Sequence, residues 1–508
     1  MSCWEQPGHE TPNGGRFERH HARSQSAAPK RMSPPNEPWR GRRLHFVGVG
    51  GAGMSGYARA AHALGAEVTG SDGALSPYAE RLRADGVLEV RIGHDVANVP
   101  AGGDVEVVYS SAVPAENPER EAARERGLKE RPRAELLAEF TEMKRTIAVA
   151  GTHGKTTTAS MIVHALRAAG ARPGWLVGAP VGGELPNAEW GEGEWLVVEA
   201  DESDRSMLSL KVEIGVLTNV ELDHHASFNS LVELEEAFRS FLNHAEKAVV
   251  VWDRPELLAL THDGSTPGQS EAGEQSGASA EASGPTSEPP EIEVVSYDVS
   301  DPRLESGGGS SFQWHGQEVA LRVPGAHNAL NATAALEAAR LAGADARAAI
   351  AGLAGFTGAG RRFQRLGETA SGAVVYDDYA HHPTEVAATL RAARTLEHGR
   401  LVGVFQPHLY SRTALLAREF GVALALADVV AVLDVYPARE RADDHPGVSG
   451  LLIAEAAADV AAGKPVYWLP GFAEAEAVLG GVLGEGDICL VMGAGDVDGL
   501  GRRLVKVT

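Results

Sequence analysis

The sequence predicts an α/β protein of three domains, and three observations support this expectation. The chain has 508 residues, and a domain averages roughly 150 residues. Short apolar runs alternate with helical stretches along most of the chain, as they do in βαβ units. Two of these runs lead directly into glycine-rich turns that begin at Gly48 and Gly151. We therefore expect a Rossmann-like N-terminal domain, a central domain of the P-loop ATPase type with a mostly parallel sheet, and a Rossmann-like C-terminal domain.

The predicted domain boundaries follow shifts in composition. Residues 1–42 are polar and lack periodicity, so we expect a disordered extension, with Met32 as a candidate for the true start. The tract 263–290 consists mostly of Ser, Gly, Glu, Ala and Pro and is predicted to be a disordered insertion. The three expected domains are residues 43–140, residues 141–322, which contain this insertion, and residues 323–508.

The charge balance excludes one broad class of function. The chain has 46 basic and 69 acidic residues, a net charge of −23, which disfavours nucleic-acid binding because phosphate backbones need clustered cations. The negative net charge does not exclude local binding sites for small anions. The cysteines, Cys3 and Cys489, make neither a disulfide framework nor a zinc cluster. The sequence has no signal pattern and no apolar run of about 18 residues. We expect a cytoplasmic protein without membrane or nucleic-acid partners.

The first glycine loop indicates a diphosphate ligand. An apolar strand, Leu44 to Val47, leads into a loop in which Gly48, Gly50 and Gly53 fit G-x-G-x-x-G. Asp72 follows at the spacing of a dinucleotide fingerprint. A tight turn without a ligand is the alternative, and any nucleoside diphosphate suits this geometry as well as NAD does.

The second glycine loop carries more specific chemistry. A strand over 146–150 runs into Gly-Thr-His-Gly-Lys-Thr, and a helix is expected up to about Ala169. Val149 occupies the first glycine position of the full P-loop pattern, but the rest of the pattern remains. In such a loop backbone N–H groups cradle phosphate, Lys155 reaches the β and γ oxygens, and Thr156 can bind Mg²⁺. A purely structural turn is the less favoured reading.

Polar residues follow two further strands of the central segment. One strand ends at Glu199 and the acidic residues 201–204, and the next leads to His224. Because the carboxyl ends of parallel strands meet at one edge, Lys155, Glu199 and His224 are expected around a metal–phosphate group. Carboxylates and hydroxyls suit Mg²⁺, whereas histidine is a softer ligand than usual for it. Residues 201–204 could instead be a solvated acidic loop.

The third segment shows the same pattern of polar residues near strand ends. Asn328 and Asn331 open an Ala-rich helix, where one of them could be only a cap. Arg361 and Arg362 adjoin a glycine turn and could hold phosphate, although surface Arg pairs are common. Further polar residues follow the strands expected at 374–376 and 401–405, namely Asp378, Tyr379, His381, His408 and Arg412.

Taken together, these stretches resemble the Mur ligase family over about residues 43–505. The shared motifs are "HFVGVGGAGMSG", "AGTHGKTTT", "EADESD", "TNVELDH", "PGAHNALNATAAL", "GAGRRF", "DDYAHHPTE" and "FQPHLYSRT". The resemblance implies ATP-dependent ligation of L-alanine to the carboxylate of UDP-N-acetylmuramate through an acyl phosphate, in peptidoglycan precursor synthesis, with ATP and Mg²⁺. The first domain would bind the UDP-sugar, the central domain ATP, and the third domain the amino acid.

The resemblance also implies roles for individual residues. Lys155, Glu199, His224 and Arg412 would be catalytic, and Thr156, Glu199 and His224 would hold the metal. The implied ATP contacts are Gly151, Thr152, His153, Gly154, Lys155, Thr156, Thr157, Asn328, Asn331, Arg361, Arg362 and Asp378. The implied UDP-sugar contacts are Gly50, Gly51, Ala52, Gly53, Met54, Ser55, Asp72, His94, Ser110 and Ser111. Tyr379, His381 and His408 would line the region of the incoming amino acid.

Two positions depart from the family pattern. Leu409 stands where many relatives have Arg, which makes the contact to the alanine carboxylate depend more on Arg412. His225 and Ala226 replace a position where relatives often have an acid. The resemblance implies no role for residues 1–42 or 263–290. The oligomeric state could be a monomer or a homodimer.

Three alternatives differ in their predicted function. A recycling ligase of the same family would add an intact peptide instead of L-alanine, but its first glycine loop usually differs. A dehydrogenase that uses NAD would have no use for the loop at Lys155. A silent nucleotide-binding scaffold would not need Lys155, Glu199 and His224 together.

Overall fold

A computed structural model describes residues 37–183, 185–223, 228, 230–261 and 292–505. Met32, Cys3, His224 to Ala226 and the tract 263–290 lie outside the described residues. Of the extension predicted to be disordered, residues 37–42 are described and pack on the first domain. The Trp39 ring is 7 % exposed and stacks on Phe140 with centroids 5.1 Å apart. The disorder predicted for these six positions is therefore wrong, because an aromatic anchor holds them.

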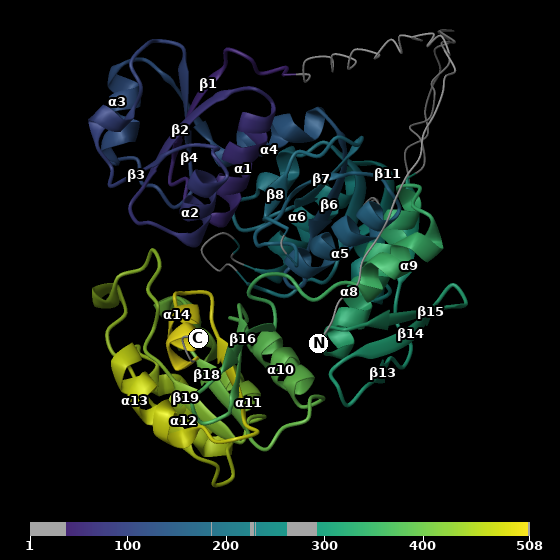
Figure 1. Ribbon diagram of the computed structural model, residues 1–508, viewed down its shortest axis with the longest axis vertical. Coiled ribbons are helices and arrows are strands. Elements are labelled where there is room, and N and C mark those ends of the chain that lie inside the picture. The colour runs from purple at the N-terminus through teal and green to yellow at the C-terminus, as the bar shows by residue number, and fades with distance from the viewer. Residues whose placement is uncertain (1–36, 184, 224–227, 229, 262–291, 506–508) are drawn as a thin grey trace, which may run out of the picture. The chain divides into compact units, whose positions relative to one another are not determined.

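The first domain is a parallel sheet with helices on it (Figure 1). Its strands are β1 (Arg43–Val47), β2 (Glu67–Asp72), β3 (Val90–Ile92), β4 (Val105–Tyr109) and β5 (Lys129–Pro132). Their order is β3-β2-β1-β4-β5, all parallel, which is the Rossmann-like order. Its helices are α1 (Ala52–Ala63), α2 (Pro77–Ala84), α3 (Pro118–Glu125) and α4 (Arg133–Glu142), with a 3₁₀ turn at Val96–Asn98.

The central sheet has the order β12-β11-β10-β6-β9-β7-β8, and only β8 runs antiparallel to its neighbour. Its strands are β6 (Arg145–Ala150), β7 (Gly174–Leu176), β8 (Ala188–Glu189), β9 (Trp195–Glu199), β10 (Val212–Leu217), β11 (Ala245–Trp252) and β12 (Glu293–Tyr297). Its helices are α5 (Lys155–Ala168), α6 (Leu231–Asn243) and α7 (Pro255–Leu258), with 3₁₀ turns at Ser206–Ser209 and Ala259–Thr261. Strand β6 lies between β9 and β10, so the three predicted polar strand ends are neighbours.

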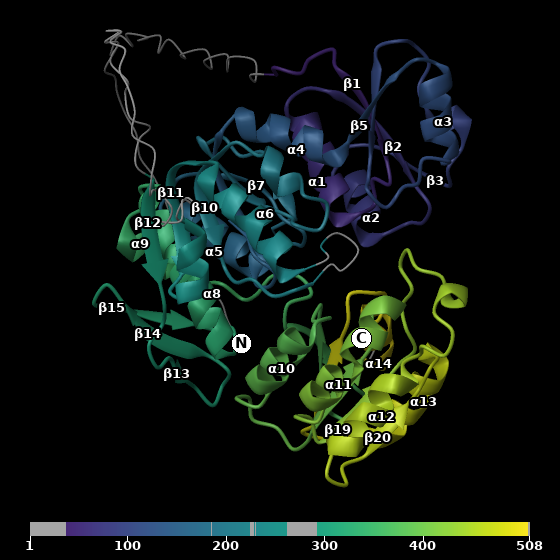
Figure 2. The same ribbon diagram turned by 180° about the vertical axis from the view of Figure 1, so that it is seen from behind.

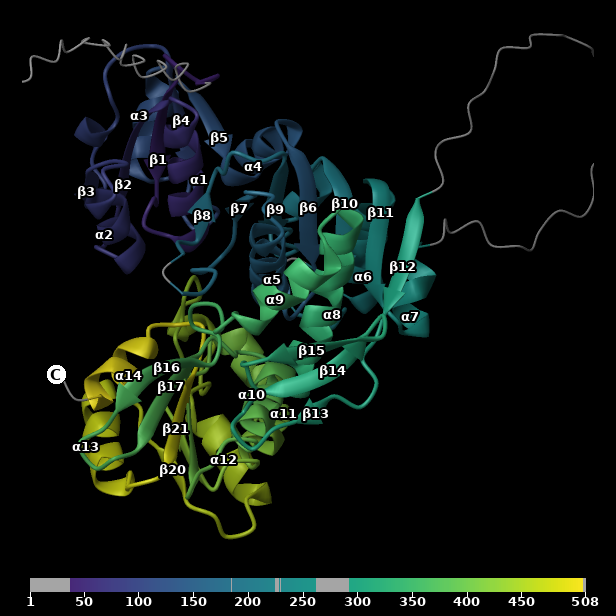
Figure 3. The same cartoon turned by 45° about the vertical axis from the view of Figure 1, so that its right-hand side comes forward.

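A small antiparallel sheet and two helices follow the central sheet (Figure 3). They are β13 (Arg303–Leu304), β14 (Ser310–Trp314), β15 (Gln317–Leu321), α8 (Ala326–Leu341) and α9 (Ala346–Ala354). Helices α8 and α9 pack on α5, and their buried residues share one core with the central sheet up to Ala359. The boundary predicted at 322 and 323 therefore does not match the packing, since the apolar faces of α8 and α9 are buried on the central side.

The last sheet has the order β16-β17-β21-β18-β19-β20, parallel except for β16. Its strands are β16 (Gln364–Glu368), β17 (Val374–Asp378), β18 (Leu401–Phe405), β19 (Val429–Val432), β20 (Val466–Trp468) and β21 (Ile488–Met492). Its helices are α10 (Pro383–Ala393), α11 (Tyr410–Leu424), α12 (Leu451–Val460), α13 (Phe472–Val482) and α14 (Asp498–Leu504), with a 3₁₀ turn at Ala442–Asp444. Helices α10, α11 and α12 cover one face and α13 and α14 the other (Figure 2).

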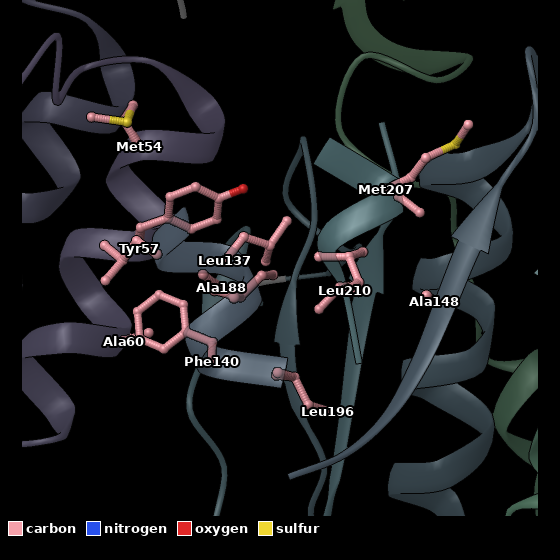
Figure 4. Packing of buried hydrophobic residues seen from close by; sticks show 14 of the residues in the cluster. Met54, Tyr57, Ala60, Leu137, Phe140, Ala148, Ala188, Leu196, Met207 and Leu210 are labelled. Carbon is pink, nitrogen blue, oxygen red and sulfur yellow. The ribbon is translucent and has the colours of Figure 1, made fainter. Parts of the chain in front are cut away.

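The cores show which domains are joined by apolar packing. Figure 4 shows Tyr57 of α1 and Phe140 of α4 beside Ala188 and Leu196 of the central sheet, in one continuous cluster. The last sheet has its own clusters on its two faces. No described helix is long and apolar enough to cross a membrane.

Candidate active site

The second glycine loop joins β6 to α5 and needs glycine at two positions. Gly151 has φ +124° and Gly154, the residue before α5, has φ +84°. A Cβ on Gly151 would lie 2.1 Å from the Thr218 hydroxyl oxygen, and a Cβ on Gly154 would lie 2.7 Å from Asn331 Oδ1. The loop is therefore pressed between the end of β10 and helix α8, with Lys155 at the first position of α5.

Lys155 is held by a buried carboxylate that the sequence did not single out. Its Nζ donates to both Glu202 oxygens at 3.0 and 2.9 Å and to the Gly151 carbonyl at 2.6 Å. Burial disfavours the charged form, but Glu202 and Asp201 outweigh it, so the pKa of Lys155 is raised. The ammonium stays charged inside the loop. Because Glu202 is 1 % exposed, the alternative of a solvated acidic loop is wrong for this residue.

Glu199 ends β9 beside the same loop. The Gly178 N–H donates to Glu199 Oε1 at 2.6 Å, and Thr156 also bonds to this carboxylate. Burial raises the pKa of Glu199, while the Gly178 N–H and Lys155 oppose the rise. A hydroxyl and a carboxylate are the hard oxygen donors that Mg²⁺ prefers, so the residues present fit this ion. His224, the third predicted metal ligand, lies outside the described residues.

A cavity of about 240 Å³ opens on one side of the loop. Predicted ATP contacts that line it are His153, Gly154, Thr157, Asn328, Asn331, Arg362 and Asp378. Asn328 and Asn331 do not cap α8, which begins after Gly325. Instead the Asn328 amide donates to the Pro324 carbonyl at 2.7 Å, and Asn331 lies against the glycine loop. The capping alternative is therefore wrong for both.

The structure separates the two arginines that the sequence paired. Arg361 donates to the carbonyls of Gly493 and Gly495 and to Asp377, so it braces the loop after β21. Arg362 lines the cavity and lies 3.5 Å from Glu385 of α10. Arg362 is thus the guanidinium that faces this cavity, and Arg361 points elsewhere because backbone carbonyls satisfy it.

Asp378 sits at the end of β17 with its carboxylate facing the same cavity. It accepts from the N–H groups of Phe363 and Ala380, both at 2.8 Å. Burial raises its pKa to about 6, although Arg362 and these donors oppose the rise. Tyr379, next in the chain, lies under both guanidiniums, with Arg362 5.2 Å from its ring centroid.

The predicted amino-acid region gathers between β17, β18 and the loop after β10. The rings of His381 and His408 lie 6.0 Å apart, and burial lowers their pKa values to about 3 and 4. Both imidazoles are neutral near pH 7. Arg412 lies 3.4 Å from His408 Nδ1 and donates to Asp223 at 2.5 Å. Arg412 therefore links helix α11 to the segment that leads to His224.

The first glycine loop is held by Asp72 itself. The Gly50 N–H donates to Asp72 Oδ2 at 2.8 Å, and Ser76 donates to the Gly50 carbonyl at 2.7 Å. Gly51 precedes α1, which begins at Ala52, while the Met54 side chain is 2 % exposed and lies in the core. The Met54 side chain is thus placed for packing.

One predicted UDP-sugar contact, His94, lies near a buried carboxylate, and two others follow β4. His94 Nδ1 lies 3.0 Å from Glu119, which is fully buried and also accepts from Ser71 and pairs with His45 at 2.7 Å. Ser110 follows β4 beside Gly48, and Ser111 is exposed. The roles of His94, Ser110 and Ser111 stay predictions.

A second cavity, of about 200 Å³, connects the first loop with Glu199. Ala52 and Gly53 line one end, and Gly178, Glu199 and Asp201 line the other. Arg133, at the start of α4, also lines it and pairs with Asp201 at 2.9 Å and Asp204 at 2.7 Å. Sequence reasoning missed Arg133, since a lone Arg that opens a helix carries no signal.

Comparison with known families covers nearly the whole described chain. Residues 43–145 match the model "Mur ligase family, catalytic domain", residues 149–339 the "Mur ligase middle domain", and residues 361–495 the "Mur ligase, glutamate ligase domain". The chain belongs to the Mur ligase family. The predicted resemblance, the three-domain α/β fold and the class of ATP-dependent ligase are thereby confirmed.

Individual members of the Mur ligase family are similar to this chain over most of their length. The UDP-N-acetylmuramate–L-alanine ligase of Rhodococcus opacus is 42 % identical over 91 % of this chain and 96 % of its own. The enzyme of the same name from Kineococcus radiotolerans is 44 % identical, over 92 % and 96 %. The solved UDP-N-acetylmuramate–alanine ligase of Thermotoga maritima has a TM-score of 0.73 at 27 % identity, covering 91 % of this chain and 98 % of that one.

Proposed function

We propose that this protein joins L-alanine to the lactyl carboxylate of UDP-N-acetylmuramate and converts ATP to ADP and phosphate. The similar curated ligases carry this activity in their names. The observation that carries the proposal is the position of the two cavities. One runs from the first glycine loop to Glu199, and the other lies on the Thr157 side of the ATP loop, so they flank Lys155 and Thr156.

The proposed reaction has two steps. A carboxylate oxygen attacks the γ-phosphorus of ATP, ADP leaves, and an acyl phosphate forms. The alanine amine then attacks the acyl carbon, phosphate leaves, and the amide forms with loss of the amine proton. The first step is needed because a carboxylate oxygen is a poor leaving group until it carries phosphate.

The chain's residues are assigned to these steps by their positions. Lys155, kept charged by Glu202, stabilises the charge on the transferred phosphoryl group. Thr156 and Glu199 would hold Mg²⁺, with His224 as a further ligand, and the ion supplies charge neutralisation when it is bound. Arg362 and Asp378 face the nucleotide from the last domain.

The acceptor and amino-acid sides complete the proposal. The first domain would hold the UDP-sugar around the loop Gly50 to Ser55, with Arg133 beside Glu199. Tyr379, His381, His408 and Arg412 would line the alanine site. We also propose a cytoplasmic location, which rests on the sequence features described above.

The test is ADP release driven by L-alanine. In Lys155→Ala we expect ADP release to fall by about a hundredfold to a thousandfold, since a preorganised charge is lost at the transferred phosphoryl. Calorimetric binding of UDP-N-acetylmuramate should persist, because that cavity is lined by other residues. Turnover near the wild-type rate would overturn the mechanism. If the wild-type protein used the tripeptide L-Ala-γ-D-Glu-meso-diaminopimelate in place of L-alanine, the assigned substrate would be wrong.

A further inference from the structure

Three side chains from separate segments converge beside the ATP cavity, and two of them line it. His153 belongs to the glycine loop, Glu221 follows β10, and His382 is the N-cap residue of α10. His153 Nε2 lies 3.2 Å from Glu221 Oε2, and His382 Nδ1 lies 3.4 Å from the same oxygen. One nitrogen or oxygen ligand atom from each residue lies within 4.8 Å of the others.

The nitrogen–oxygen distances of 3.2 and 3.4 Å are close to those between ligands of one small cation. Two ligands about 2.0–2.1 Å from a tetrahedral Zn²⁺ lie roughly 3.3 Å apart. Two imidazoles and one carboxylate are also a ligand set that zinc uses in proteins, whereas Mg²⁺ prefers oxygen ligands alone. This group differs in residues and in ligand type from the Thr156 and Glu199 pair.

Neighbouring residues orient two of the three ligands. The other ring nitrogen of His153, Nδ1, lies 3.3 Å from Glu385, as a carboxylate lies behind a ligating histidine in many metal sites. Thr384 donates its hydroxyl to Glu221 Oε2 at 2.7 Å. Both imidazole side chains are about nine-tenths buried, and their rings lie 4.9 Å apart. The two carboxylates offset the charge of a dication.

We propose that His153, Glu221 and His382 form a binding site for Zn²⁺ or a similar transition-metal dication, separate from the Mg²⁺ site of the reaction. The cation would join the ATP loop and the segment after β10 to the first turn of α10. Since His153 and Glu221 line the ATP cavity, a bound cation would hold its wall closed and slow nucleotide exchange. Zn²⁺ would thus inhibit turnover even with Mg²⁺ in excess.

Protons compete with the cation for His153. Burial lowers its pKa, but Glu385 and Glu221 outweigh burial, and the pKa is raised to about 9. The ligand form of imidazole is neutral, so metal binding must release this proton. Burial and the neighbouring His153 lower the pKa of His382, which favours the neutral form of its ring.

The test measures zinc binding without substrates, on the full chain without a polyhistidine tag. The chain has 19 histidines, so the decisive quantity is a difference between variants. After removal of metal by a chelator, Zn²⁺ is titrated in competition with a chromophoric chelator, and Co²⁺ absorption reports four-coordinate geometry. His382→Asn removes the ligand but keeps an N-cap side chain, and His62→Asn, at an exposed position of α1, is the matched control.

We expect wild type and His62→Asn each to bind one Zn²⁺. His382→Asn should bind it roughly a hundredfold more weakly, because losing a direct ligand costs at least as much affinity as losing a residue that only orients a ligand. Glu221→Gln should weaken it similarly, and zinc inhibition of ADP release should shift in parallel. Equal affinity and stoichiometry in wild type, His382→Asn and Glu221→Gln would overturn the proposal, leaving an ion-pair network only. Thermal unfolding confirms that each variant is folded. If the wild-type protein had no ligase activity, the proposed reaction would be contradicted, but the difference in zinc affinity between the variants would still stand.

Discussion

Glu119 shows how a single buried carboxylate can stabilise the first domain. It is fully buried and bonds to His45, Asn98, Ser71 and His94. Burial raises its pKa, but these four hydrogen bonds outweigh burial and lower the pKa to about 2. Since the pKa is lower in the folded state, the ionised form stabilises the fold above the unfolded value near 4.5, and this stability is lost as pH falls toward 2.

We therefore expect Glu119→Gln to lower the free energy of unfolding by about 3 kcal/mol at pH 7, from 1.36 kcal/mol per pKa unit. The gap between variant and wild type should narrow as pH is lowered from 5 toward 3. Thermal unfolding followed over this range measures it. Glu89→Gln, at an exposed side chain, is the control and should unfold as wild type does. A gap that is constant with pH would contradict the assigned ionisation.

At the scale of elements, the loop between β6 and α5 depends on the space that glycine leaves. Gly151→Ala would place its Cβ 2.1 Å from Thr218 Oγ1 and 2.9 Å from the Asn219 carbonyl. We expect a loss of roughly 1–3 kcal/mol of stability from overpacking and about a hundredfold loss of ADP release from a loop displaced by about 1 Å.

Gly170→Ala, just after α5, is the matched control for this change. Its φ of +80° is also positive, so an alanine there is strained as well, but no atom lies within 4 Å of the added Cβ. It should cost roughly 1–2 kcal/mol of stability and leave the rate of ADP release unchanged. Equal loss of rate in both variants would show that backbone strain, and not the contact with Thr218, accounts for the effect.

The same elements show how far the sequence could predict the structure. Strand β18 lies where predicted, because an unbroken apolar run is a local signal. The sequence could not predict which domain contains α8, since the composition of an Ala-rich helix does not show which sheet the helix covers. Likewise, Arg361 and Arg362 are indistinguishable by type, and only the carbonyls after β21 separate them.

At the scale of the whole molecule, the last domain is joined to the central one by polar contacts at the site. Its sheet has separate apolar clusters, whereas the first and central domains share one. One of these polar contacts is the buried pair between Arg412 and Asp223, each 3 % exposed, with an N–O distance of 2.5 Å. A domain held in this way can open without unfolding, which agrees with the need to admit ATP and release ADP.

Asp223→Asn tests this arrangement. Removing one partner of a buried pair costs about 3–5 kcal/mol, but here Arg412 can return to water when the domain opens. The cost should therefore appear as loss of the closed state. We expect ADP release to fall by at least about a hundredfold, the rate equivalent of 3 kcal/mol, with an unfolding midpoint close to that of wild type. Calorimetric binding of UDP-N-acetylmuramate should be retained, because the first and central domains stay packed together.

Asp85→Asn, which breaks the pair with Arg59 within the first domain, is the control for Asp223→Asn and should leave turnover unchanged. A wild-type rate in Asp223→Asn would mean that closure does not depend on this pair, and a large drop in the unfolding midpoint would mean that the two domains unfold as one unit.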